Sequence, residues 1–386
     1  MASLSLRGHT GNVLCLALSP GSNPTQARVA SGGEDGVARI WDAGTGKCVR
    51  GLRNDTQGQD CASLCWQGED LVYASFGQEV KLFDLRTNTS PVLMNSKSIC
   101  ARPAEDDINN IAVNERGTFL ATADDSGAVV VTDLRTNRPF KRFRSGHNNL
   151  ATSVRFHPTR PWEVWSSSMD CTVRRWDFSR GSVTQAFNMA ETEIPQPSPT
   201  SQTINPPFVH AIEFHTTTGI AAAGLGDGSI ALFSPPSPQP QSKRRKNNNS
   251  NNMGDSTSYS LGARLEGGHT WAVTALTFPR LAPATGMPRL ISGSLDGSLL
   301  TWAINQSSSS SSTSTIPALP TTIPKHRVTT TRKIDCMAAL PPMNDESVVL
   351  LIGGPLNPSS NINSTPAPGG LAPPRDGDIE AYIVQL

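Results

Sequence analysis

Hydrophobic and polar residues alternate in short runs along most of this chain, and one such run recurs with a fixed internal register. In five places an Asp precedes a bulky aromatic residue by six positions, in EDGVARIWD, MDCTVRRWD, GDGSIALFS, LDGSLLTWA and RDGDIEAYI. An Asp followed by a small residue favours a tight turn, and the alternating run after it predicts a β-strand. The turn aspartates are Asp35, Asp170, Asp227, Asp296 and Asp376.

Two further strands are predicted upstream of each turn. An alternating run follows Gly-His in GHTGNVLCLALSP, GHNNLATSVRFHP and GGHTWAVTALTFP, and small residues follow in RVASGGE, VWSSSM and LISGSL. Weaker copies begin at DCASLCW, DDINNIAVN, VHAIEFH and IDCMAAL, which brings the number of units to seven. An array of similar all-β units indicates binding rather than catalysis.

These phrases resemble the WD repeat, which has Gly-His near its start and Trp-Asp near its end. The resemblance implies a seven-bladed WD-repeat β-propeller, an all-β ring of four-stranded sheets. The last unit has no room for an outer strand of its own, whereas SLSLR stands directly before Gly8 and His9. Residues 3–7 are therefore predicted to complete the seventh blade, so that the N-terminal strand closes the ring and removes its open edges.

Composition supports a single domain over residues 1–386 with four insertions. The insertions are rich in Pro, Ser, Asn or Gly and cannot bury enough apolar surface to offset the entropy of ordering, so they are expected to be disordered. Their ranges are 190–207, 234–258, 305–324 and 354–375.

Charge and cysteine content exclude several classes of function. The formal net charge is +1, so no global field draws the chain to nucleic acid, and no apolar run is long enough for a membrane span. No basic segment precedes an apolar run at the N-terminus, so a signal peptide is not expected. The close pair Cys61 and Cys65 lacks a second pair, which predicts reduced thiols and no metal site. A nuclear or cytoplasmic location is expected.

Three units repeat one set of His, Ser, Asp and Trp, which has the composition of a nucleophile site. A catalytic triad needs one cleft with an oxyanion hole, and three copies at one register argue against it. The WD-repeat resemblance implies instead a structural hydrogen-bond network within each blade. The members are His9, Ser31, Asp35 and Trp41; His147, Ser166, Asp170 and Trp176; and His269, Ser292, Asp296 and Trp302.

The other units depart from this set. Gly77 stands at the turn position of the second unit, the third shifts its acidic pair to 124–125, and Thr132 takes the position of the Trp. Phe233 and Tyr382 replace the Trp in the fifth and seventh units and have no indole N–H to donate. These blades are expected to depend more on their neighbours.

Two consecutive units share another motif, FDLRTN at 83–88 and TDLRTN at 132–137. In each, an Arg follows by two residues the Asp that ends the third strand. The motif resembles the Trp-Asp-x-Arg box that consecutive repeats carry in substrate receptors of cullin-4 ubiquitin ligases. Phe83 and Thr132 replace the Trp of that box.

The resemblance implies that Arg86 and Arg135 contact the ligase adaptor and that Asp84 and Asp133 shape the turns. A planar guanidinium suits this role because it makes bidentate, charge-assisted hydrogen bonds. The alternative is an ordinary local ion pair within each turn.

A compact basic cluster lies in the second insertion. Lys243, Arg244, Arg245 and Lys246 have the composition of a nuclear import signal, and the alternative is a solvated charge run.

Other surface residues are less specific. Lys141, Arg142 and Arg144 alternate on a predicted outer strand, where charge protects a sheet edge, with phosphate contact as the alternative. Trp162 and Trp271 are candidate interface anchors, or else pack against a neighbouring blade.

Taken together, the sequence predicts a protein-binding scaffold that is not an enzyme and uses no cofactor, metal or small molecule. One face would dock on the cullin-4 ligase adaptor and the other would bind an unknown substrate protein. The alternative is a scaffold unrelated to ubiquitin, in chromatin work or ribosome assembly. Nucleic acid or a membrane is not the expected partner.

Overall fold

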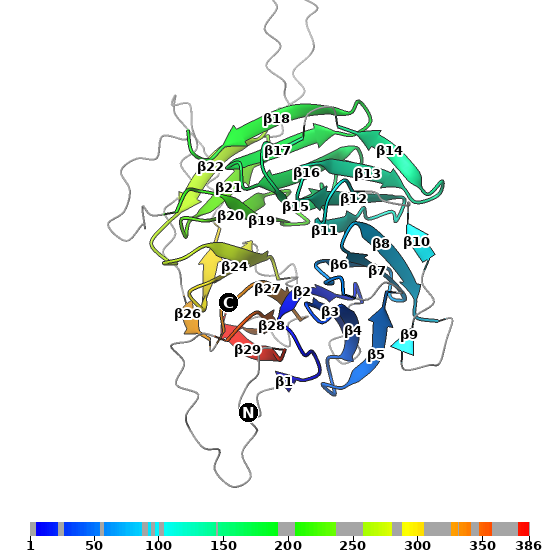
Figure 1. Cartoon of the computed structure of the whole chain (residues 1–386). Helices are drawn as coiled ribbons and strands as arrows, with labels where there is room; N and C mark the ends of the chain where they lie inside the picture. The colour runs from blue at the N-terminus through cyan, green and yellow to red at the C-terminus, as the bar shows by residue number, and fades with distance from the viewer. Residues whose placement is uncertain are drawn as a thin grey trace, which may run out of the picture.

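The computed structural model shows seven β-sheets arranged around a centre (Figure 1). It describes residues 5–21, 27–54, 58–86, 92–93, 97–99, 104–143, 146–191, 205–236, 258–279, 288–304, 326–330, 332–340, 347–356 and 377–385. Every regular element among them is a strand, so this part of the chain contains no helix that could cross a membrane.

Each sheet is one blade, and its strands run from the centre outward. Blade one consists of β2 (Val13–Leu18), β3 (Arg28–Gly33), β4 (Val37–Asp42), β5 (Cys48–Arg53) and β9 (Val92–Leu93), and blade two of β6 (Leu64–Gln67), β7 (Leu71–Phe76), β8 (Glu79–Asp84) and β10 (Lys97–Ile99). Blade three consists of β11 (Ile108–Val113), β12 (Phe119–Asp124), β13 (Val129–Asp133) and β14 (Arg138–Arg142), and blade four of β15 (Ala151–Phe156), β16 (Glu163–Ser168), β17 (Thr172–Asp177) and β18 (Ser182–Asn188).

Blades five to seven complete the ring. Blade five consists of β19 (Val209–Phe214), β20 (Ala221–Leu225), β21 (Ile230–Ser234) and β22 (Ser260–Leu265). Blade six consists of β23 (Val273–Thr277), β24 (Arg289–Ser294), β25 (Ser298–Ala303) and β26 (His326–Thr329). Blade seven consists of β27 (Cys336–Ala339), β28 (Ser347–Gly353), β29 (Ile379–Gln385) and β1 (Ser5–Leu6).

The first and last strands of the chain close the ring, which confirms the predicted seven-bladed propeller. β1 pairs antiparallel with β29, so that Ser5 lies opposite Glu380 and Leu6 opposite Ile379. In Figure 1 the blue end of the chain accordingly lies beside the red end. Leu6 is completely buried, and burial of a leucine side chain contributes about 1.5–3 kcal/mol.

The hydrophobic core is divided among the seams between blades. Each of the seven buried clusters joins side chains of two neighbouring sheets, including the seam where blade seven meets blade one. That last cluster contains Leu6 and Ile379 from blade seven together with Val13 and Trp41 from blade one. A blade therefore obtains its core by stacking on its neighbours, as expected for a repeat architecture.

Small residues on the second strands permit this close stacking. A Cβ added to Gly32 in β3 would lie 2.6 Å from the carbonyl oxygen of Cys61, at the entrance to blade two. A Cβ on Gly293 in β24 would lie 2.7 Å from Ile334 Cγ2, at the entrance to blade seven. The small-residue runs of the sequence thus mark places where the next blade packs against the strand.

The loops of the ring lie on two opposite faces. On one, the entry face, loops before the inner strands bond to the turns between second and third strands. Its backbone hydrogen bonds join Glu34 to Asn12, Asp125 to Asp107, Met169 to Leu150 and Leu295 to Ala272. On the other, the docking face, the turns after the third strands bond to the loops after the first strands. Its hydrogen bonds join Ala43 to Ala27, Leu85 to Asp70, Leu134 to Thr118 and Phe178 to Trp162.

One strand was not expected from the sequence. Val92–Leu93 forms β9, which adds a fifth strand to blade one and pairs parallel with β5. Much of the predicted insertions, together with Asp376, lies outside the described residues. The gaps are 192–204, 237–257, 305–325 and 357–376.

Candidate functional site

His9 connects three other side chains of blade one. Its Nδ1 lies 2.9 Å from Asp35 Oδ1, and its Nε2 lies 2.7 Å from Ser31 Oγ. Trp41 Nε1 donates to the same serine oxygen at 2.7 Å. These contacts fit one arrangement, in which the indole N–H donates to Ser31, the Ser31 hydroxyl to Nε2, and Nδ1–H to the carboxylate.

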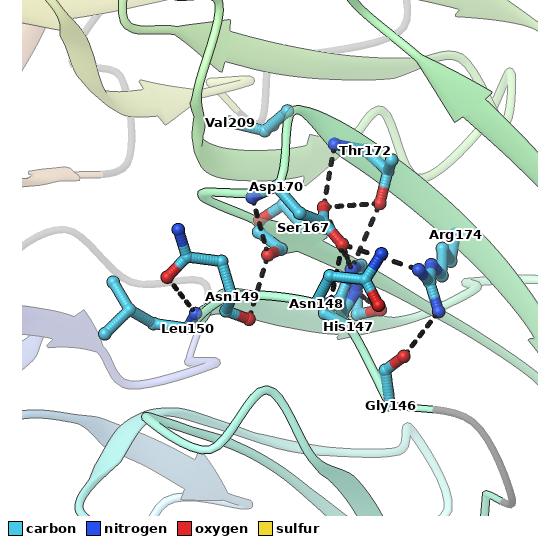
Figure 2. A network of polar contacts seen from close by, with 12 residues as sticks. Gly146, His147, Asn148, Asn149, Leu150, Ser167, Asp170, Thr172, Arg174 and Val209 are labelled. Carbon is cyan, nitrogen blue, oxygen red and sulfur yellow. Dashed lines mark hydrogen bonds and ion pairs between the residues drawn. The ribbon is translucent and has the colours of Figure 1, made fainter.

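Blade four contains the same network with one addition, Thr172. Figure 2 shows the contacts of His147, Asp170 and Thr172. His147 Nε2 lies 2.7 Å from Ser166 Oγ, to which Trp176 Nε1 donates at 2.8 Å. His147 Nδ1 lies 3.1 Å from Asp170 Oδ2. The Thr172 hydroxyl donates to the other carboxylate oxygen of Asp170 at 2.6 Å, and its backbone N–H donates at 3.0 Å.

In blade six a serine lies between the histidine and the aspartate. His269 Nε2 lies 2.6 Å from Ser292 Oγ, and Trp302 Nε1 donates to that oxygen at 2.8 Å. His269 Nδ1 lies 2.6 Å from Ser298 Oγ but 3.9 Å from Asp296, and Ser298 donates in turn to Asp296. Ser298 was not predicted from the sequence, although a hydroxyl residue two positions after the turn Asp, as at Thr172, indicates a further member of the network.

The electrostatics of these networks suit a structural role. Burial opposes ionisation of Asp35, Asp170 and Asp296, but hydrogen bonds from His, hydroxyl and backbone donors outweigh it and hold each pKa well below its usual value. Burial lowers the pKa of His147 and of His269. The three serines are fully buried and committed to their partners, so they are out of reach of a substrate. Among the described residues no group of three His, Cys, Asp or Glu could hold a metal ion.

Blades three and five hold their turns differently. In blade five, Arg264 on the outer strand donates Nε to Ser229 Oγ at 2.7 Å and forms an ion pair with Asp227. In blade three, Asp124 accepts the Ser126 hydroxyl at 2.6 Å. Thr132, at the tryptophan position, is fully buried, and its Oγ1 has no hydrogen-bond partner among the described residues.

Blade seven uses a buried ion pair in place of the indole. Arg332, which is fully buried, donates Nε to Glu380 Oε1 at 2.9 Å and Nη1 to the Gly354 carbonyl at 2.9 Å. The Tyr382 hydroxyl donates to the other Glu380 oxygen at 2.6 Å. Arg332 belongs to the segment between blades six and seven, whereas Glu380 belongs to β29. The ion pair therefore joins the third strand of blade seven to a segment that precedes the blade.

A further buried network lies at the seam of blades four and five. His157 Nδ1 accepts the backbone N–H groups of Thr159 and Arg160, each at 3.1 Å, and its Nε2 lies 2.6 Å from the Tyr259 hydroxyl. Tyr259 donates to the Gly219 carbonyl at 2.7 Å. Burial lowers the pKa of His157 to about 4 and raises the pKa of Tyr259 to about 12. Protonating Nδ1 would remove the acceptor of two backbone donors.

The turn after β8 displays an arginine on the docking face. Asp84 Oδ1 accepts the backbone N–H of Arg86 at 3.0 Å and its Nε at 2.9 Å, and Oδ2 accepts Nη2 at 2.7 Å. These hydrogen bonds hold the pKa of Asp84 at about 2. Arg86 is nevertheless 64% exposed, so its fork is oriented by Asp84 and open to solvent.

The turn after β13 repeats the geometry with a freer arginine. Asp133 Oδ1 accepts the Arg135 N–H at 2.8 Å, while the side-chain groups stand 3.7 Å apart. Arg135 is 83% exposed and Asp133 only 17%. The structure thus shows a local ion pair in both turns and an outward guanidinium in both. Thr87 and Asn88 of the first motif lie outside the described residues.

The same Asp-capped turn occurs in blades one and four. In blade one, Asp42 Oδ1 accepts the N–H groups of Gly44 and Thr45 at 2.9 Å, and no arginine follows within the turn. In blade four, Asp177 caps the turn and Arg180 stands 80% exposed with its Nε 3.5 Å from the Asp177 carboxylate. Three consecutive blades therefore display an exposed arginine in the turn after the third strand. Arg180 was not predicted from the sequence, because it stands three residues after its Asp and not two.

Both candidate anchor tryptophans are exposed. Trp162 lies in the loop after the first strand of blade four and contacts Phe119, Phe140 and Phe178, so it is packed on one side and open on the other. Trp271 lies on the entry face, where the Ser294 hydroxyl donates to its carbonyl at 2.9 Å.

A cavity of about 480 Å³ occupies the centre of the ring, lined by the inner strands of all seven blades. Its titratable lining includes Cys15, Cys65, Arg155, His210 and Asp335. Burial raises the pKa of Asp335 to about 6 and that of Cys65 to about 12, so the thiol is protonated and unreactive at neutral pH. The six cysteines among the described residues form no disulfide.

Some predicted residues cannot be placed. Lys243, Arg244, Arg245 and Lys246 lie outside the described residues, as does Arg144. The backbone of Lys141 and Arg142 belongs to β14, the outer strand of blade three.

Comparison with known proteins places the chain among WD-repeat propellers. The sequence model of a family described as "Nucleolar protein 10-like, N-terminal domain" matches residues 15–235. The WD repeat-containing protein 53 homolog of Dictyostelium discoideum is 28% identical over 59% of this chain and 63% of its own length. The third repeat, ATADDSGAVVVTDL, and the fourth, HNNLATSVRFHP, predict a likeness to WD-repeat protein 53, and this similarity confirms it.

Other relatives are similar over shorter segments. The target of rapamycin complex subunit wat1 of Schizosaccharomyces pombe is 28% identical over 44% of this chain and 51% of its own length. The ribosome biogenesis protein BOP1 of Rattus norvegicus is 25% identical over 44% of this chain and 27% of its own length. The chain thus spans less than two thirds of the length of these curated relatives.

Proposed function

Because the chain belongs to the family of nucleolar protein 10-like N-terminal β-propeller domains, we propose that it works as a protein-binding scaffold and not as an enzyme. The polar networks with the composition of an active site are buried and serve to hold blades in shape. What remains accessible is the loops and turns of two opposite faces, and a scaffold uses such faces to hold two proteins at once.

The finer proposal is that the protein is a substrate receptor of a cullin-4 RING ubiquitin ligase. The observation that carries it is the pair of Asp-capped turns in consecutive blades, which present Arg86 and Arg135 on one face. Each Asp lies beside its arginine without covering it, so the guanidinium N–H groups that the Asp does not bind can donate to carboxylates or carbonyls of the ligase adaptor.

The entry face would then bind the substrate protein. It lies at the opposite ends of the strands from Arg86 and Arg135, so a substrate and the adaptor would not compete for space. Its exposed Trp271 has the character of an interface anchor, because large aromatic side chains dominate binding energy at protein interfaces.

Pull-down with the purified adaptor of cullin-4 tests the receptor assignment. We expect Arg86→Ala with Arg135→Ala to abolish binding, and the double change to Lys to weaken it strongly, because lysine keeps the charge but loses the fork. Arg53→Ala, on the outer strand of blade one, is the matched control and should bind normally. Wild-type levels of binding by the double alanine variant, or no binding by the wild type, would refute the assignment.

Family membership favours a second candidate, a scaffold in ribosome assembly. The family is described as nucleolar protein 10-like, and one relative is a ribosome biogenesis protein. This candidate predicts that the chain co-sediments with pre-ribosomal particles and that its depletion causes precursor ribosomal RNA to accumulate. Unchanged precursor levels on depletion would exclude it.

The nucleolar description of the family favours a nuclear location over a cytoplasmic one, and the proposed import signal is Lys243, Arg244, Arg245 and Lys246. A fluorescent fusion in which all four are alanine should shift to the cytoplasm. Retention in the nucleus would assign import to another segment.

A further inference from the structure

Four aromatic rings meet on the docking face at the seam of blades three and four. We call Phe119, Phe140, Trp162 and Phe178 the aromatic patch. Trp162 lies 5.8 Å from Phe119, 6.2 Å from Phe140 and 5.3 Å from Phe178, measured between ring centroids. Phe178 is fully buried, whereas Trp162 is 47% exposed and Phe140 is 37% exposed. The patch thus has a buried base and an open surface.

The local backbone fixes the positions of these rings. Val131 pairs with Lys141 and Thr132 with Pro139, so Phe140 is an extra residue at a β-bulge and has no partner on β13. Bulges redirect a side chain at a sheet edge, which accounts for the exposure of Phe140. The Phe178 N–H donates to the Trp162 carbonyl at 3.0 Å, which ties the loop of Trp162 to the turn after β17.

Three exposed arginines lie close in the chain to two rings of the aromatic patch. We call Arg135, Arg138 and Arg180 the arginine rim: Arg135 and Arg138 precede Phe140 in the turn before β14 and at its first residue, and Arg180 follows Phe178 in the turn after β17. Arg135 and Arg180 are 83% and 80% exposed, whereas their carboxylates, Asp133 and Asp177, are 17% and 24% exposed. Arg138 is exposed and forms no ion pair among the described residues.

We propose that the aromatic patch and the arginine rim together bind a short acidic segment of a partner protein. An apolar side chain of that segment would lie on Trp162 and Phe140, and its flanking carboxylates would bind Arg138 and Arg180. Apolar contact at the centre with charged groups at the rim is the usual organisation of a protein interface, in which Trp and Arg dominate the binding energy. The rings are held by one another before binding, so little conformational entropy is lost on association.

The charges favour a protein segment over nucleic acid. Tight binding to a phosphate backbone requires many cations, whose neutralisation of phosphates supplies most of the affinity. The described residues here provide three exposed guanidinium groups, two of them beside their own Asp, and the whole chain carries only +1. Three guanidinium groups suit a peptide in which a few carboxylates flank an apolar residue.

This inference goes beyond the proposed function: the arginine rim shares Arg135 with the proposed adaptor site, but the aromatic patch, Arg138 and Arg180 lie outside that site, and the proposal does not depend on the cullin-4 adaptor. The test is fluorescence anisotropy of the full chain with a labelled peptide in which Leu-Phe is flanked on both sides by Asp and Glu. Control peptides carry Lys in place of the acids or Ser in place of Leu-Phe, and an oligouridylate RNA is the nucleic-acid probe. We expect the acidic peptide to bind at least tenfold more tightly than any of the three.

Variants separate this surface from the proposed adaptor site. Trp162→Ala should weaken peptide binding at least tenfold, and Arg138→Glu with Arg180→Glu, which alters only exposed side chains, should abolish it. Arg86→Ala should leave it unchanged whatever its effect on the adaptor. The proposal is overturned if the acidic peptide binds no better than the lysine or serine control, if the charge-reversed variant binds normally, or if RNA binds more tightly than the peptide.

Discussion

Blades three and four are neighbours of the same architecture, yet they satisfy their buried polar groups in different ways. Blade four connects Trp176, Ser166, His147 and Asp170 in one chain of hydrogen bonds. Blade three has Thr132 at the tryptophan position, and that buried hydroxyl oxygen has no partner among the described residues. Both blades nevertheless form four-stranded sheets of the same topology.

The difference separates what specifies the fold from what strengthens one blade. The two blades share a seam cluster in which Ala121 and Val131 of blade three pack against Val154 and Trp176 of blade four. Apolar packing of this kind occurs at every seam, whether or not a network is present. We infer that stacking defines the ring, and that the His–Ser–Asp–Trp network adds rigidity and stability locally.

The largest expected effect is the loss of a network aspartate. Asp170→Ala should cost about 3–5 kcal/mol of unfolding free energy, because it leaves His147, the Thr172 donors and the Asn148 N–H without their acceptor. Urea unfolding followed by tryptophan fluorescence measures it. Asp106→Ala, at the exposed entry of blade three, should change stability by less than about 0.5 kcal/mol. Equal losses in the two variants would show that the network aspartate contributes no more to stability than an exposed carboxylate does.

A smaller effect is expected from acidification. The folded-state pKa values of His147, His157 and His269 are lowered by burial, so the unfolded chain binds protons that the folded chain does not. Their stabilisation is full above the unfolded pKa near 6.5 and is lost as pH falls below it. For His157, with its pKa at about 4, the loss between pH 7 and 5 is up to about 2 kcal/mol.

The measurement is thermal or urea unfolding at a series of pH values. Asp35, Asp170 and Asp296 have lowered pKa values and lose their stabilisation only below the ordinary range of aspartate, so they do not contribute in this window. Asp335, whose pKa burial raises to about 6, binds its proton more readily in the folded chain and offsets part of the loss. His157→Gln should flatten the pH dependence between 7 and 5. An unchanged slope in that variant would assign the effect to other groups.

The smallest expected effect is an increase, not a decrease, in the free energy of unfolding. Thr132→Val replaces the unpartnered hydroxyl of blade three with a methyl group of similar size and should stabilise the protein by about 1 kcal/mol. In blade four, Ser166→Ala should destabilise by about 1–2 kcal/mol, because it leaves Trp176 and His147 without their shared partner. Destabilisation by Thr132→Val would indicate that its hydroxyl has a partner after all.

Most of the fold could be predicted from the sequence because each blade is encoded locally. The Asp turn, the aromatic residue and the Gly-His entry all lie within one repeat. SLSLR could be assigned to the last blade because that repeat has no room for an outer strand of its own. β9 could not be predicted, because its two residues pair with β5 of the preceding blade and carry no signal in their own repeat.

The polar contacts were predictable only where their partners keep a fixed register. The three His, Ser, Asp and Trp sets follow that register, and the structure brings each together. Arg264, which replaces the histidine in blade five, comes from the outer strand across the second insertion, and Arg332 reaches Glu380 from another blade boundary. The aromatic patch escaped prediction for the same reason, since its four rings come from two strands of blade three and from a loop and a turn of blade four.

The pairing of β1 with β29 also sets an order of events during translation. Ser5 and Leu6 are made long before their partners Glu380 and Ile379. Until then the nascent chain holds an unpaired strand and an unsealed seam beside Trp41. A chaperone that shields this segment would therefore be needed until β29 has been made, and loss of either strand would damage the same blade.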